Sequence, residues 1–275
     1  SRAPPAHRED ALSVPNQQRI LVLGGYGFFG SKICAALARH PRLQLIIAGR
    51  DLDKATALAY QLGLSADRAR ALDATNPQLP LLLRKLDVGT LIHTAGPFQD
   101  QSYAVAHAAI QARCNYLDLA DGREFVQAIA SLDAAARAAD VAVVSGVSSL
   151  PALSSAVVDR YLPNFARLDT IRMGISSGAV IPGLATVRAV LGYAGQSFKT
   201  LEAGRWIDVR GWLDRVVYEF PKPVGPRLLG RCDVPDLDLL PKRYPSLKTM
   251  SFHAGFASDA GHQCVEVLAR FVRDG

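Results

Sequence analysis

The chain has 275 residues, 49% of them hydrophobic and 20% charged, so it is long enough for one large domain or two modest domains with real cores. No apolar run approaches the ~20 residues that span a bilayer, and residues 1–17 have the polar, proline-bearing character of a flexible tail rather than of a signal peptide, so we expect a cytoplasmic protein that does not bind membranes. The net charge of +6 does not indicate a nucleic-acid partner, because the basic residues are spread along the chain and alternate with Asp and Glu.

From Arg19 onward, short β-rich runs alternate with longer helical patterns. This alternation is typical of successive right-handed βαβ units, which build a parallel sheet. Strands are predicted at Ile20–Leu23, Leu43–Ala48, Ala69–Leu72, Thr90–Thr94, Tyr116–Leu119 and Val141–Ser145. Helices are predicted between them at Ser31–Arg39, Leu52–Leu62, Leu79–Leu86, Ser102–Arg113 and Glu124–Ala139. The pattern predicts an α/β fold with a Rossmann-type doubly wound parallel sheet.

The pattern changes after about Leu168, where alternating strands, loops rich in Gly and Pro, and both tryptophans follow. This change predicts a second, α+β domain. We place the dinucleotide-binding domain at 18–155 and a substrate and dimerisation domain at 156–275. The last helical pattern, from Cys264 to Phe271, is followed by no element that would cover it, which predicts that the second domain is incomplete at the C-terminus.

The first predicted strand runs directly into Gly24-Gly25-Tyr26-Gly27-Phe28-Phe29-Gly30, and a helix follows. In this context a G-x-G-x-x-G motif predicts a dinucleotide-binding turn. Gly25 permits the tight turn, Gly27 lets the backbone approach the pyrophosphate, and Gly30 lets the helix pack closely on the sheet. The free N–H groups at the helix start stabilise the phosphate charge. The alternative is a Gly-rich turn without a ligand.

The end of the second strand favours NADP over NAD. An Asp or Glu about 20 residues beyond the loop would bond the ribose 2′-OH of NAD, but Gly49 stands there and Arg50 follows. A 2′-phosphate would therefore meet a cation. NAD stays open because of the neighbouring Asp51, and Arg50 is alternatively a solvated turn residue. Asp73, which closes the third strand, either approaches the adenine edge or is a surface turn residue.

Candidate site residues also follow the fourth and fifth strands. Small residues at the first of these edges leave space for the nicotinamide and its ribose: Ala95, Gly96 and Pro97. His93 is a weak candidate for an acid or base, the alternative being a hydrogen-bonded histidine at a strand end. Asp118 and Asp121 are weak candidates for orienting a proton shuttle, but Asp121 also suits a turn or helix N-cap. No metal site is predicted, because the cysteines are scattered and lack C-x-x-C spacing: Cys34, Cys114, Cys232 and Cys264.

Over residues 19–160 the chain resembles the saccharopine dehydrogenase-like oxidoreductases, including the saccharopine reductase and carboxynorspermidine dehydrogenase branches. The resemblance lies in the glycine turn, Ala48-Gly49-Arg50, Ala95-Gly96-Pro97-Phe98, Asn115-Tyr116-Leu117-Asp118-Leu119 and the segment Gly146–Ser154. It implies NAD or NADP bound by the first domain, and a second domain that makes substrate and dimer contacts, so we expect a homodimer. Two places differ from many relatives: Pro151-Ala152-Leu153, where relatives usually have Pro-Gly-Leu, and Asp121-Gly122, where many have Gly-Glu after the fifth strand.

The resemblance implies an NADP-dependent dehydrogenase or reductase that transfers a hydride to or from an amino-acid-derived imine or carbonyl compound. Arginines of the second domain are candidates for binding a substrate carboxylate: Arg172, Arg188 and Arg205. One alternative is a short-chain-dehydrogenase-like reductase, but the required Tyr-x-x-x-Lys pair occurs only as Tyr244 to Lys248, late in the chain and with Pro245 inside it. Another alternative is a non-catalytic NADP-binding redox sensor.

Overall fold

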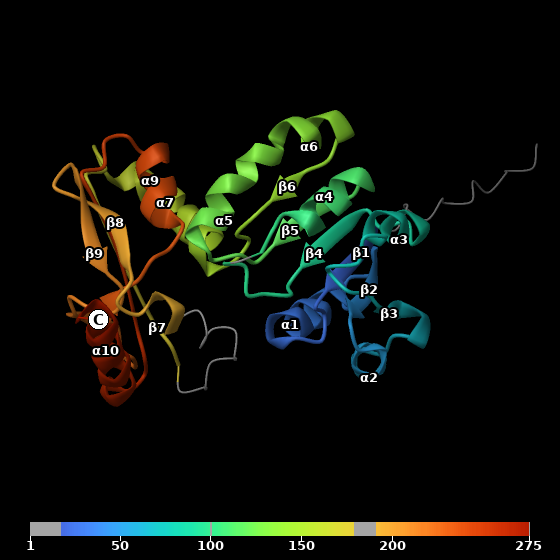
Figure 1. Ribbon diagram of the computed structural model, residues 1–275, viewed down its shortest axis with the longest axis horizontal. Helices are drawn as coiled ribbons and strands as arrows, with labels where there is room; N and C mark the ends of the chain where they lie inside the picture. The colour runs from blue at the N-terminus through green and yellow to red at the C-terminus, as the bar shows by residue number, and fades with distance from the viewer. Residues whose placement is uncertain (1–17, 100, 179–190, 275) are drawn as a thin grey trace, which may run out of the picture.

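The computed structural model describes residues 18–99, 101–178 and 191–274 (Figure 1). The predicted tail at 1–17 and the candidate Arg188 lie outside the described residues. The described residues form a parallel sheet flanked by helices and a second, mostly antiparallel sheet, which confirms the predicted fold class. No helix built from these residues combines the length and the apolar character that a membrane span requires.

The first sheet has six parallel strands in the order β3-β2-β1-β4-β5-β6. This is the order of doubly wound dinucleotide-binding sheets, in which the chain changes direction across the sheet between β1 and β4. The strands are β1 (Gln18–Leu23), β2 (Leu43–Gly49), β3 (Ala69–Ala71), β4 (Thr90–His93), β5 (Asn115–Asp118) and β6 (Val143–Val144).

Helices cover both faces of this sheet, which explains why its strands are apolar almost throughout. Leu21 and Leu23 of β1 face α3, α4 and α6, whereas Ile20 and Val22 face α1 and α2. The helical elements are α1 (Phe28–Leu37), α2 (Leu52–Gln61), η1 (Ala66–Arg68), α3 (Leu79–Lys85), α4 (Ala104–Gln111), α5 (Arg123–Ala128), η2 (Ile129–Leu132) and α6 (Asp133–Ala139). The helix predicted at Glu124–Ala139 is thus divided by the tighter turn η2, and α1 begins before the predicted Ser31, inside the glycine motif.

The second sheet is built around β12, which pairs in parallel with β7 and antiparallel with β8 and β11. Its strands are β7 (Thr170–Ser176), β8 (Ser197–Glu202), β9 (Arg205–Arg210), β10 (Val216–Phe220), β11 (Gly225–Arg231) and β12 (Thr249–Gly255). The helical elements of this part are η3 (Ser149–Leu153), α7 (Ser154–Tyr161), η4 (Leu162–Asn164), α9 (Asp236–Arg243) and α10 (Asp259–Asp274). Met250 and Phe252 of β12 form a buried core with Leu237 and Leu240 of α9.

The two sheets are joined through α5, α7 and α9, which lie between them in Figure 1. Arg123 of α5 donates to the Asp233 carboxylate and to the Lys199 carbonyl, each at 2.8 Å. Its Nε also donates to Asp238 of α9. These contacts connect the first sheet's last helices to the second sheet and bring its strands β7, β8 and β12 toward the carboxyl ends of β4 and β5.

Candidate cofactor and active site

The turn after β1 is held by backbone contacts that only glycine allows. Gly24 has a φ of +82°, donates its N–H to the Ala48 carbonyl at 2.8 Å and accepts from the Gly27 N–H at 2.9 Å. A Cβ at Gly30 would lie 2.2 Å from the Gly24 carbonyl oxygen, so α1 approaches the turn only because residue 30 lacks a side chain. A Cβ at Gly27 would meet only that same oxygen, at 3.1 Å. The space that a side chain at residue 27 would occupy is otherwise open, so a ligand can reach the backbone there.

Gly25 has a different task from the one its sequence position predicts. The left-handed backbone that makes the turn tight occurs at Gly24, whereas Gly25 is buried between β1, β2 and α1. A Cβ at Gly25 would lie 2.9 Å from Ile47 and 3.2 Å from the Cys34 sulfur. Gly25 thus allows α1 to pack closely on the sheet, as Gly30 does.

A cavity of about 900 Å³ opens in front of this turn. It lies at the carboxyl ends of β1, β2 and β4, where open α/β sheets bind their ligands. Helix α1 has Gly27 as its N-cap, no side-chain cap and no acidic residue in its first turn, so its first N–H groups suit a diphosphate. Eight predicted cofactor-binding residues line the cavity: Tyr26, Gly27, Phe28, Phe29, Arg50, Asp73, Ala95 and Gly96. Pro97 lines an adjoining cavity instead.

Sequence reasoning missed Gln101, which also lines this cavity. Its Nε2 donates to the Ala95 carbonyl at 2.8 Å and to the Pro97 carbonyl at 2.6 Å. These bonds hold the loop after β4 in place. Gln101 lies in a loop with no motif around it, so only the folded chain identifies it.

At the end of β2, the space left by Gly49 is filled by Tyr26. A Cβ at Gly49 would lie 2.4 Å from the Tyr26 ring, and the Tyr26 hydroxyl accepts from the Asp51 N–H at 2.9 Å. The Asp51 carboxylate accepts from the Lys54 N–H at 3.1 Å and so caps α2. Asp51 is therefore engaged, and Arg50 carries the only positive charge among the described residues that line the cavity.

Asp73 lies at the edge of the cavity and is also a turn residue. It lines the cavity, and its carboxylate accepts from the N–H and the hydroxyl of Thr75 at 2.9 and 2.8 Å. These bonds, together with the nearby charge of Arg50, hold the pKa of Asp73 below its usual value. Asp73 is thus an ionised turn residue at the edge of the cavity.

His93 is buried below the site. It is 1% exposed, its Nδ1 lies 3.2 Å from the Tyr116 hydroxyl, and its ring packs edge-on against Phe98 with 5.1 Å between centroids. Burial lowers the pKa of His93 to about 4, so the imidazole is neutral near neutral pH. This position favours a packing role over acid or base catalysis.

Asp118 is fully buried at the end of β5. Its Oδ1 accepts from the N–H groups of Ala120 and Gly146 at 2.9 and 2.8 Å, and from the Ser145 hydroxyl at 2.9 Å. Asp118 therefore ties the end of β5 to the segment that follows β6. It shapes the edge of the sheet without lining any of the cavities described for this site.

A second cavity, of about 340 Å³, lies between the end of β5 and the second sheet. Phe29 lines both this cavity and the larger one, so the two cavities adjoin at its side chain. Asp121 lines the second cavity and accepts from Gln99 Nε2 at 3.2 Å. Desolvation raises the pKa of Asp121, and it raises the pKa of the neighbouring Tyr193 to about 12. A carboxyl group with a raised pKa beside a dinucleotide cavity is a candidate acid or base.

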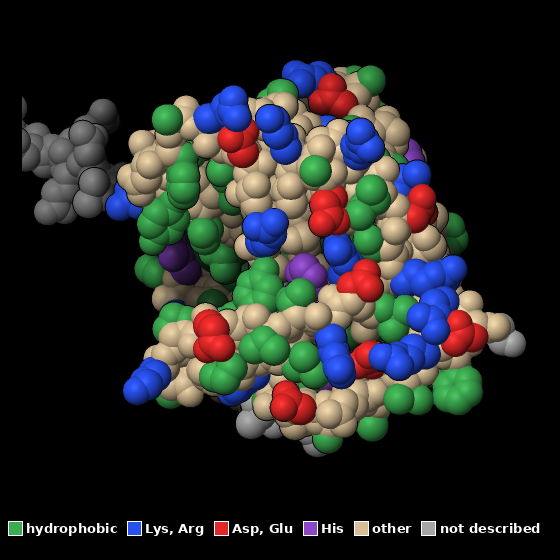
Figure 2. Space-filling view, turned by 90° about the vertical axis from the view of Figure 1, so that its left-hand side faces the viewer, with side chains coloured by type: hydrophobic (Ala, Val, Ile, Leu, Met, Phe, Trp, Pro, Cys, Tyr) green, Lys and Arg blue, Asp and Glu red, His purple; other side chains and the backbone are tan. Residues whose placement is uncertain are grey.

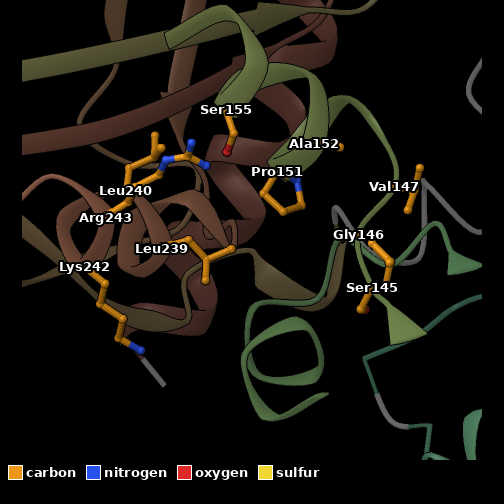
Figure 3. A pocket seen from close by; sticks show the side chains of 11 residues that line it. Ser145, Gly146, Val147, Pro151, Ala152, Ser155, Leu239, Leu240, Lys242 and Arg243 are labelled. Carbon is orange, nitrogen blue, oxygen red and sulfur yellow. The ribbon is translucent and has the colours of Figure 1, made fainter. Parts of the chain in front are cut away.

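A third cavity, of about 530 Å³, lies between η3, α7 and α9 and is lined by none of the predicted site residues. In Figure 3, Arg243 is directed toward Ser155, whereas Lys242 points away from it. Arg243 and the Tyr244 hydroxyl both contact the Asp159 carboxylate. The Tyr244 hydroxyl is thus bonded to a residue of α7, and Tyr244 does not line the cofactor cavity. The predicted Tyr244–Lys248 pair therefore does not stand where a short-chain dehydrogenase needs it, among the described residues that line that cavity.

The strand order, the glycine turn and the cavity beyond it define a Rossmann-type dinucleotide-binding domain joined to a second domain with a mostly antiparallel sheet. Residues 20–144 match the family described as "Saccharopine dehydrogenase NADP binding domain". This part of the chain therefore resembles that domain. The match confirms the predicted resemblance to saccharopine dehydrogenase-like oxidoreductases and the predicted nicotinamide cofactor.

Over 86% of its length the chain is similar in structure to apo saccharopine dehydrogenase (L-Glu forming) from Saccharomyces cerevisiae, of which 54% is covered, with 19% identity and a TM-score of 0.66. It thus spans about half of that relative, and at this identity the likeness shows the fold alone. Two weaker matches have TM-scores of 0.48. An inositol dehydrogenase homolog from Azotobacter vinelandii is 14% identical and covers 90% of this chain and 66% of its own. A myo-inositol dehydrogenase from Corynebacterium glutamicum is 15% identical and covers 87% of this chain and 68% of its own. No curated protein sequence matches the chain.

Proposed function

We propose that the protein is an NADP-dependent oxidoreductase that exchanges a hydride with a C=O or C=N carbon bound in the second cavity. The observation that carries this proposal is the position of Phe29, whose side chain lines both a dinucleotide-sized cavity and a smaller neighbouring one. The nicotinamide, when bound, supplies or accepts the hydride. In the reductive direction, NADPH, a proton and the double bond yield NADP⁺ and an alcohol or amine.

The residues of the chain would bind the cofactor, position its ribose and protonate the substrate. The N–H groups at the start of α1 hold the diphosphate, and Ala95 and Gly96 leave space for the nicotinamide ribose. Asp121, held by Gln99, donates the proton to the substrate oxygen or nitrogen, and its raised pKa keeps the carboxyl group partly protonated above the usual range. The family resemblance implies that the substrate is an amino-acid-derived imine or carbonyl compound.

Preference for NADP over NAD is part of the proposal and depends on Arg50. Because one charge-assisted contact contributes about 1.5–3 kcal/mol, Arg50→Asp should weaken NADPH binding about tenfold or more and change NADH binding much less. The matched control is Arg42→Asp, an exposed arginine that is not among the cavity-lining residues. Fluorescence titration with both reduced dinucleotides measures the effect. Equal weakening of both dinucleotides would contradict the assignment of NADP.

Turnover is tested by the loss of NADPH absorbance with a panel of carbonyl compounds and preformed imines. We expect oxidation of NADPH with at least one compound. Tight NADPH binding without oxidation across the panel would favour the redox-sensor alternative. If neither NADPH nor NADH binds the intact protein, the proposed function is wrong.

A further inference from the structure

The geometry points to an apolar, uncharged carbonyl compound or imine as the substrate of the second cavity, in place of an amino-acid-derived carboxylate. This inference rests on the proposed function, because it names the substrate class of the same site. It comes from the chemistry of the side chains that line the cavity and from the places where the nearby cations lie.

Aromatic and aliphatic side chains form most of the wall. Trp212 and Phe256 stack with 5.3 Å between their ring centroids and 17° between their planes. Phe252, which is 4% exposed, and Val234 continue this wall from the core of the second sheet. Such a wall favours apolar substrate surface in proportion to the area removed from water. A carboxylate would lose its hydration there without gaining a cationic partner among the described lining residues.

The charged side chains that face the cavity are both negative. Asp121 and Asp233 are the only charged residues among the described residues that line it. Arg123, the described cation that contacts the Asp233 carboxylate, is already paired with it at 2.8 Å. Cys232 and Tyr193 remain uncharged, because burial raises the pKa of each to about 12. A carboxylate ligand would therefore meet charge of its own sign.

Of the arginines predicted to bind a substrate carboxylate, the two that the structure describes do not line this cavity. Arg172 lines a separate cavity together with His253, and Arg205 is exposed at the start of β9. Figure 2, which views the second-sheet end of the molecule, shows Lys and Arg side chains spread over the outer surface among Asp and Glu. The hydroxyl groups of Ser149 and Ser177, which also line the second cavity, are neutral and suit a single carbonyl oxygen or imine nitrogen. The Ser148 hydroxyl already donates to the Leu150 carbonyl at 2.9 Å.

A binding experiment with two matched ketones tests this inference separately from turnover. The probes are 2-octanone and 7-oxooctanoate, which differ only in a terminal methyl or carboxylate group. The chain has two tryptophans, and Trp206 is 46% exposed on β9, so Trp206→Phe leaves Trp212 as the sole tryptophan reporter inside the cavity. Titrations are run with the intact protein saturated with NADP⁺.

We expect 2-octanone to change the Trp212 fluorescence and to bind at least about tenfold more tightly than 7-oxooctanoate. Failure of NADP⁺ to bind would refute the proposed function. Intact NADP⁺ binding with equal or tighter binding of 7-oxooctanoate would overturn the substrate class alone. So would an absence of 2-octanone binding up to its solubility limit.

A charge introduced at the cavity wall gives a second test. Ile175 lines the cavity from β7 but is 43% exposed, so Ile175→Lys should fold. The matched control is Val217→Lys, which places the same side chain at a 63% exposed position on β10 outside the cavity lining. We expect Ile175→Lys to shift the affinity ratio toward 7-oxooctanoate by about tenfold and Val217→Lys to leave it unchanged. An unchanged ratio in both variants would place the ketone outside this cavity and overturn the inference.

Discussion

Replacing Arg123 by Met should separate the contribution of a buried charge network from that of ordinary surface ion pairs. The Arg123 side chain is 11% exposed, and its partners Asp233 and Asp238 are 15% and 20% exposed. Methionine keeps much of the apolar volume but leaves both carboxylates without their cation. Removing one partner of a buried pair costs about 3–5 kcal/mol. Because both Asp side chains keep some contact with water, we expect a loss of about 3 kcal/mol in the free energy of unfolding.

Urea denaturation measures this loss, with Arg137→Met as the matched control. Arg137 pairs with Asp133 at 2.8 Å, but the two side chains are 79% and 62% exposed, so its replacement should not change stability measurably. The loss at Arg123 should also shrink in acid. In the wild type, desolvation raises the pKa of Asp233 although Arg123 opposes it, whereas the pKa of Asp238 is lowered because its desolvation is outweighed by the hydrogen bond and charge of Arg123. Without the guanidinium, both native pKa values rise above the unfolded values.

The native variant then binds more protons than the unfolded chain, so its stability increases as the pH falls through the raised pKa values. The difference from the wild type should therefore be smaller at about pH 5 than at about pH 7. If Arg123→Met is no more destabilising than Arg137→Met, or if its effect does not change with pH, the network is not the buried link between the sheets that we describe.

Three further predictions concern the site. Gly27→Val should weaken NADPH binding more than about tenfold with little change in the melting temperature, because its side chain enters the open cavity. Gly30→Ala should instead lower the melting temperature, because its Cβ would lie 2.2 Å from the Gly24 carbonyl oxygen. Thermal melts and NADPH titrations distinguish the two effects. Burial lowers the pKa of His93 from 6.5 to about 4, so the wild type should lose stability as the pH falls through that interval, since only the unfolded chain gains the proton. His93→Phe should flatten this slope in denaturation curves and leave the pH dependence of turnover near neutrality unaltered. Wild-type reductive turnover should decline as the pH rises past the raised pKa of Asp121. Asp121→Asn should slow turnover and remove this decline. If the variant shows the same decline, another group donates the proton.

The first sheet was predictable because its signals are local. Each of its central strands is a short apolar run followed by Gly, Pro or Asp, and this pattern reports burial on both faces. The prediction was less accurate where tertiary packing determines the outcome. Val141–Ser145 forms a strand only at Val143–Val144, where β6 ends the sheet and pairs with β5 alone. The helix at Glu124–Ala139 is interrupted at Ile129–Leu132 although no Gly or Pro marks the position.

The cofactor turn was also predictable, because its signals are local in the sequence. Much of the second cavity was not predictable. Gly49 is explained by the Tyr26 ring, which belongs to a different turn. Asp118 and Asp121 are similar candidates in the sequence. In the structure, Asp118 is fully buried and bonded to backbone N–H groups, whereas Asp121 lines a cavity. Trp212 and Phe256 stack on each other although they lie far apart in the sequence. No spacing rule connects such residues, so the polarity of the second cavity emerges only from the folded chain.

Asp233 links the stability of the protein to its proposed specificity. The same carboxylate pairs with Arg123 of α5 and lines the second cavity. Its negative charge is tolerated at low exposure because the guanidinium compensates it, and the guanidinium is in turn unavailable to a substrate carboxylate. A change that released Arg123 toward the cavity would weaken the contact between the two domains at the same time. Acceptance of anionic substrates is therefore opposed by the interaction that holds α5 to the part of the chain that lines the second cavity.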